Sequence, residues 1–99
     1  MILLEDLQKV QHSVKRIVLD VLKLRDPSLP EFAMRLSEME GVEGVNVSLV
    51  EMDQNTESVK IAIEGNDINL NHVQELLKNC GAVLHSIDEV VVGKKIVTI

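Results

Sequence analysis

The sequence predicts an α+β sandwich in which a strand–helix–strand unit occurs twice. Three observations lead to this prediction. Apolar residues alternate with a period of two near residues 15–24, 42–52 and 59–64, as they do in half-buried strands. Two intervening stretches carry helix caps and an apolar stripe at helical spacing. Each of these stretches is followed by a glycine, Gly41 or Gly81, and glycine commonly ends a helix.

Residues 1–14 are expected to form an N-terminal helical extension. Leu3, Leu7, Val10 and Val14 are spaced four, three and four residues apart, which is a heptad seam. Two heptads are too short for a stable isolated coiled coil. Two alternatives stay open: the helix packs on its own domain, or it contacts another copy of the chain.

The first unit begins with a strand over residues 15–24. Apolar residues occupy both of its faces, which is typical of a central strand. The following helix is expected near residues 28–40, because Ser28 and Glu31 form a capping box. The next strand, over 42–52, completes the unit.

The second unit begins after the polar turn at residues 53–57. The alternating strand that follows forms a hairpin with the strand before the turn. Asn69 is the expected N-cap of a helix near residues 69–80, and a last strand runs from Gly81 to Gly93. Residues 94–99 form a short C-terminal tail with strand propensity.

Two such units with right-handed crossovers give a four-stranded antiparallel sheet with both helices on one face. The expected fold is therefore the ferredoxin-like βαββαβ sandwich, with strand order 4-1-3-2. The domain is predicted to cover residues 15–93.

The other face of this sheet would be uncovered, and it would carry more aliphatic side chains than solvent normally contacts. The two sheet edges are further templates for pairing. We therefore expect a closed homo-oligomer, to which the tail contributes by adding to an edge strand of a neighbour. The predicted interface residues are Val18, Leu22, Val50, Met52 and Ile87.

Composition narrows the classes of partner. The chain has 99 residues, of which 45% are hydrophobic, and a formal net charge of −6. This charge argues against nucleic acid and against anionic membranes as partners. Cys80 is the only cysteine, so an internal disulfide is excluded. The first residues, Met1–Asp6, carry acids where a signal peptide would have a basic start, so the expected location is the cytoplasm. Cys80 is expected on the buried face of its helix as a small hydrophobe.

The densest group of chemically active side chains is in the last strand. His85, Ser86 and Asp88 invite comparison with a catalytic triad, but strict alternation would point His85 away from the other two. His85 and Asp20 form a better pair, because they would share the uncovered face if the first and last strands are neighbours. Such a pair is an acid–base unit, two metal ligands, or a polar contact inside an oligomer interface. The interface is the favoured interpretation.

Acidic residues gather near the predicted hairpin turn and on a separate loop. Carboxylates in loops can hold a divalent cation such as calcium, although the pattern is not an EF-hand loop. The alternative is a solvated acidic rim. No other cofactor is indicated. The candidate ligand or metal residues are Glu51, Asp53, Glu57 and Asp67.

Three runs in order resemble a small archaeal family, the domain-of-unknown-function family 211. They are Arg16–Lys23 (RIVLDVLK), Gly41–Asn46 (GVEGVN) and His85–Val90 (HSIDEV). The resemblance covers residues 15–93, and residues 1–14 look like an extension of the family pattern. It implies a ferredoxin-like fold and self-assembly. It implies no established activity, so it provides no catalytic residues.

Together these observations favour a non-enzymatic, self-assembling α+β module that binds a small ligand or divalent cation at subunit boundaries. The alternative is a small oligomeric enzyme that uses His85 and Asp20 as acid and base.

Overall fold

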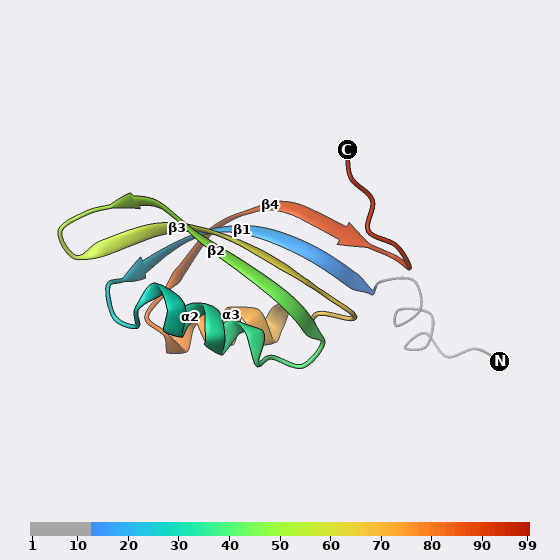
Figure 1. Cartoon of the computed structure of the whole chain (residues 1–99), viewed down its shortest axis with the longest axis horizontal. Helices are drawn as coiled ribbons and strands as arrows, with labels where there is room; N and C mark the ends of the chain where they lie inside the picture. The colour runs from blue at the N-terminus through green and yellow to red at the C-terminus, as the bar shows by residue number, and fades with distance from the viewer. Residues whose placement is uncertain (1–12) are drawn as a thin grey trace.

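A computed structural model of the chain describes residues 13–99. Four strands form one antiparallel sheet in the order β2-β3-β1-β4, and both helices lie against the same face of it (Figure 1). This confirms the predicted ferredoxin-like arrangement and its strand order. The elements are β1 (Val14–Leu24), α2 (Leu29–Ser37), β2 (Val42–Met52), β3 (Thr56–Gly65), α3 (Leu70–Asn79) and β4 (Val83–Val92).

Both helices begin at the predicted caps. The hydroxyl of Ser28 accepts a hydrogen bond from the Glu31 backbone N–H. The side-chain Oδ1 of Asn69 accepts hydrogen bonds from two backbone N–H groups in the first turn of α3. These bonds satisfy donors that have no partner inside a helix. Helix α2 ends at Ser37, earlier than the predicted residue 40, because the N–H of Met39 bonds to Leu36 O in a tightened last turn.

The core lies between the sheet and the two helices. Both central strands direct their odd-numbered residues into it, and each helix adds an apolar stripe that includes Phe32 of α2 and Leu77 of α3. Burying an aliphatic side chain of this size contributes roughly 1.5–3 kcal/mol, so this layer dominates the stability of the domain. The strand residues in the core are Ile17, Leu19, Val21, Val59, Ile61 and Ile63.

The two ends of the chain were predicted to be a helix and a tail. The helix predicted for residues 1–14 lies outside the described residues, except for Ser13 and Val14, and Val14 already belongs to β1. Residues 94–99 form no strand. They leave the end of β4 on the side of the sheet that the helices do not cover (Figure 1).

The expectation of strict alternation in the last strand is wrong. The β1–β4 pairing shifts register between Val18 and Leu19 and again between Asp20 and Val21. Because paired residues share a face of the sheet, these bulges place Ile87 opposite the core residue Leu19, on the helix-covered side. A register shift between Leu49 and Glu51 likewise moves the following residue of β2, Met52, to the helix-covered side, opposite Glu57.

Candidate functional site

The sheet face that the helices leave uncovered, called the open face here, is defined by Val18, Asp20 and Leu22 of β1 and their paired neighbours. Its mixed surface combines exposed aliphatic side chains with paired charges. Leu22 is 40% exposed, and Val50 of β2 is 63% exposed. The other residues of this face are Arg16, Gly44, Asn46, Ser48, Glu51, Ser58, Lys60, Ala62, Glu64, Val83, His85, Ser86, Asp88, Glu89 and Val91.

Three of the five predicted interface residues, Val18, Leu22 and Val50, lie on the open face. Met52 does not, because the bulge in β2 places it opposite Glu57, whose side chain bonds to the buried Lys23. Ile87 lies on the helix-covered side, as described above. The expected placement of Met52 and Ile87 on the open face is therefore wrong, since each follows a bulge that exchanges the two faces of its strand.

His85 and Asp20 are brought together, as their position on neighbouring strands predicts. His85 Nδ1 lies 3.4 Å from Asp20 Oδ2. The side chain of His85 is 79% exposed, whereas that of Asp20 is 34% exposed. Both border a hollow of about 280 Å³ in the open face, with Leu22, Val50 and Glu51 among its other lining residues. The pair is thus accessible to a ligand or to a second protein surface.

Ser86 and Asp88 belong to a separate hydrogen-bonded group. Ser86 Oγ donates to Asp88 Oδ1 at 2.8 Å, and Lys60 Nζ donates to Asp88 Oδ2 at 2.9 Å. The hydrogen bonds from Lys60 and Ser86 lower the pKa of Asp88 below its ordinary value, and the bond to Asp88 raises the pKa of Lys60. Ser86 pairs with Asp20 across the strands, so it does not point away from His85 as strict alternation predicts.

Although Ser86 and His85 lie on the same face, His85, Ser86 and Asp88 do not form a catalytic triad. Within residues 13–99 the hydroxyl of Ser86 bonds to Asp88, and no hydrogen bond joins it to His85. A nucleophile must lie within hydrogen-bond reach of its base. Ser86 therefore lacks the activation that acyl-transfer chemistry requires.

A third ionic group lies at the far end of the open face. Arg16 Nε donates to Glu89 Oε2 at 2.9 Å, and Arg16 Nη1 donates to Glu64. The bond to Glu89 is the largest cause of the raised pKa of Arg16. Arg16 therefore links β1 to both of its neighbouring strands, and each cation of this face already has a carboxylate partner.

The four candidate cation ligands do not converge. Glu57 bonds to Lys23 at 2.7 Å, and Glu51 borders the open-face hollow. Asp53 closes the β2–β3 turn through its backbone, and Asp67 follows the opposite end of β3. Among the described residues, no three His, Cys, Asp or Glu side chains are placed to hold a metal ion.

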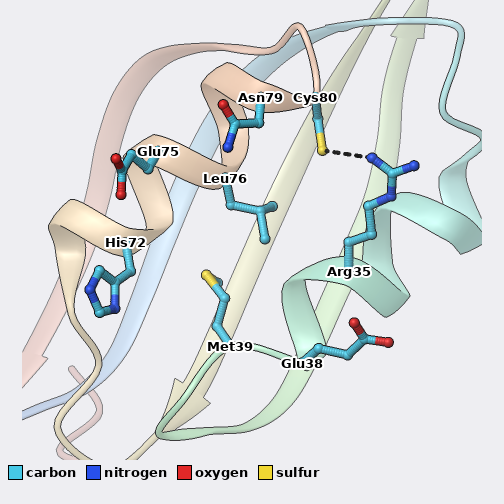
Figure 2. Close-up of a pocket in the computed structure, with 8 residues that line it drawn as sticks. All are labelled: Arg35, Glu38, Met39, His72, Glu75, Leu76, Asn79 and Cys80. Atoms are coloured by element: carbon cyan, nitrogen blue, oxygen red, sulfur yellow. Dashed lines mark hydrogen bonds between the residues drawn. The ribbon is translucent and has the colours of Figure 1, made fainter.

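Sequence reasoning missed a groove between α2 and α3, with a volume of about 400 Å³. Figure 2 shows Met39 and Leu76 pointing toward one another across it, while Arg35 Nη1 donates to Cys80 Sγ at 3.7 Å. Cys80 is buried as expected, but it is also a hydrogen-bond acceptor. Local patterns carry no sign of this contact, because Arg35 lies on α2 whereas Cys80 caps the end of α3, 45 residues later.

The fold and the open face define a class of protein. Within residues 13–99, four antiparallel strands with two helices on one face and no helix on the other make a ferredoxin-like α+β domain. No helix within residues 13–99 is long and apolar enough to span a membrane.

Residues 15–99 match the model of domain-of-unknown-function family 211, described as "Uncharacterized ArCR", and the chain belongs to this family. It is also similar to the uncharacterized protein MJ0319 of Methanocaldococcus jannaschii. The two are 43% identical over 86 residues, which are 87% of this chain and 89% of that protein.

Proposed function

We propose that this protein is a non-enzymatic, self-assembling module whose copies associate through the open face. The observation that carries the proposal is the exposure of Leu22 and Val50 on a sheet surface that the helices leave uncovered. Burying an aliphatic side chain contributes roughly 1.5–3 kcal/mol. A face with several such side chains therefore favours association over exposure to water.

The charges of the open face are compatible with burial. Arg16, Lys60 and His85 each contact a carboxylate on the same face. Ionic groups enter an interface at a tolerable cost only when they are paired and hydrogen-bonded. In this interpretation His85 and Asp20 form a polar contact between packed copies rather than a reacting pair.

The test compares two equally exposed positions on different faces. Val50 is 63% exposed on the open face, and Met34 is 59% exposed on α2. We expect Val50→Glu to raise the concentration at which the assembly dissociates at least tenfold, since it places a charge among the aliphatic side chains. Met34→Glu, the matched control, leaves that concentration unchanged. Equal effects of the two substitutions would contradict the proposal.

A small ligand or divalent cation bound at subunit boundaries is part of the same proposal. The open-face hollow supports it, because Asp20, Glu51 and His85 all border this space and a second copy would close it. Oxygen ligands from both copies would complete a coordination shell for a cation such as calcium.

We also propose a cytoplasmic location, with which the single cysteine of the chain, Cys80, is compatible.

The second candidate function is a small oligomeric enzyme in which His85 and Asp20 act as base and orienting acid. The 3.4 Å contact beside the hollow favours it, because a carboxylate that bonds one imidazole nitrogen orients the other toward a substrate. The two functions differ in the assembled protein. Modification of His85 by diethyl pyrocarbonate should be blocked by assembly if His85 is an interface residue, and should persist if it serves an open active site.

A further inference from the structure

The two edges of the sheet differ in how well they are protected against pairing. The pairing of β4 with β1 is interrupted by three register shifts, and β4 carries His85, Asp88 and Glu89. Bulges and charges of this kind prevent an edge from adding another strand. Strand β2 forms the other edge, and its protection is weaker.

The unprotected part of β2 is the run Gly44–Leu49. It pairs with β3 in unbroken register between two shifts, and it contains neither a charged residue nor proline. Within residues 13–99, β2 has β3 as its one strand neighbour, so the outward backbone groups of this run have no strand partner there. Natural edge strands of this length are usually blocked, which indicates that this edge has an occupant.

The chain itself contains a segment of matching character. Ile96-Val97-Thr98-Ile99 consists of β-branched residues, which favour strands. Ile96, Val97 and Ile99 are exposed, and the segment pairs with no strand of residues 13–99. It leaves the sheet at β4, on the side of the open face (Figure 1). Because β2 and β4 are opposite edges of the sheet, pairing of this segment with β2 is more readily made between two copies than within one.

We propose that residues 96–99 of one copy pair as an added strand with the Gly44–Leu49 edge of β2 in the next copy. This deepens the proposed self-assembly and rests on it. Main-chain hydrogen bonds would give the contact its strength, and alternate side chains would lie over the open face and the helix side. Each copy donates one segment and offers one edge, so the contact closes either as a reciprocal two-fold dimer or as a head-to-tail ring.

One test blocks the added strand without touching the domain. We expect Val97→Pro to raise the dissociation concentration of the assembly at least tenfold, because proline removes the N–H that a strand donates. Val97→Ala, which keeps the N–H, is the matched control and has a smaller effect. At concentrations at which the chains are dissociated, the circular dichroism of both variants should equal that of the parent, since residue 97 lies outside β1–β4.

A second test locates the edge that accepts the segment. In a Cys80→Ala background, a chain with Ser48→Cys is mixed with one carrying Val97→Cys or Thr98→Cys. Oxidation should give a disulfide-linked dimer. Replacing Ser48→Cys by Val90→Cys, on the β4 edge, gives none.

The outcomes separate this inference from the proposed function. Assembly that is insensitive to Val97→Pro and gives no Ser48 cross-link overturns the strand pairing but leaves open-face association standing. Equal cross-linking from Val90→Cys overturns the choice of β2 as acceptor. A full-length chain that stays monomeric overturns both proposals.

Discussion

Lys23 and Glu57 form an ion pair at the edge of the hydrophobic core, with Lys23 Nζ 2.7 Å from Glu57 Oε1. The Lys23 side chain is fully buried, and its ammonium group also donates to Leu24 O and lies 5.8 Å from the ring centroid of Phe32. The pair connects the end of β1 to the start of β3. Removing one partner of a buried ion pair strongly destabilises a fold, because the remaining charge is buried without compensation. Replacing both partners by apolar residues is often nearly neutral.

We expect Glu57→Gln to destabilise the fold by about 3 kcal/mol, because it leaves the Lys23 ammonium buried without its counter-charge. Adding Lys23→Met to that variant should recover most of the loss, since the double variant removes the uncompensated charge. Urea unfolding of the four proteins in the cycle measures both effects. Glu31→Gln, which breaks the exposed pair with Arg35, is the control and should leave stability unchanged.

Gly65 lies where β3 meets the end of the α2–β2 connection. A Cβ at this position would clash with the carbonyl oxygen of Gly41, which accepts a hydrogen bond from Asn66 N at 2.8 Å. We expect Gly65→Ala to cost about 1–3 kcal/mol, the usual range for overpacking. Gly44→Ala, which meets open space, should change stability by less than about 0.5 kcal/mol. Similar unfolding midpoints for the two variants would contradict this packing.

The pKa of Asp88 is lowered from its ordinary value of 3.8 by hydrogen bonds from Lys60 and Ser86. A carboxyl group whose pKa is lower in the folded state stabilises the fold above its unfolded pKa. That contribution disappears as the pH falls through the folded value. The melting temperature of the parent should therefore exceed that of Asp88→Asn at pH 7, and the difference should vanish near pH 2.

Lys60→Met should remove the same acid-dependent difference, because it takes away the partner that lowers the pKa of Asp88. A difference between parent and Asp88→Asn that persists undiminished at low pH would show that this ion pair is not its source.

A divalent cation held in the open-face hollow by Asp20 and Glu51 would raise the melting temperature, since it would bind only the folded assembly. We expect millimolar calcium to produce such a rise and Glu51→Gln to abolish it. Asp67→Asn is the control, because Asp67 follows the opposite end of β3. The absence of any shift in the parent protein would leave these carboxylates as a solvated rim.

The sequence was sufficient to predict the fold because its signals are local. The Ser28 and Asn69 caps, the apolar stripes and the glycine stops each involve neighbours within one turn. Strand order then follows from the handedness of the crossovers. The same logic placed His85 next to Asp20, since it depends only on which strands are neighbours.

Other features depend on contacts that no local pattern reports. The bulges that move Met52 and Ile87 off the open face arise from the pairing of two strands. The residues within one strand do not reveal them, because a run of β-branched residues is compatible with either register. Lys23 and Glu57 are 34 residues apart, so the burial of Lys23 has no signature within β1. The groove beside Cys80 likewise depends on how α2 and α3 lie next to each other.

The central claim is that copies of this chain associate through the open face. Multi-angle light scattering of the full-length protein, across micromolar concentrations, tests it most directly. The account predicts one species with a mass that is an integer multiple of 11.0 kDa, shifted toward the monomer by Val50→Glu but not by Met34→Glu. A mass of 11.0 kDa for the parent chain throughout that range would contradict it.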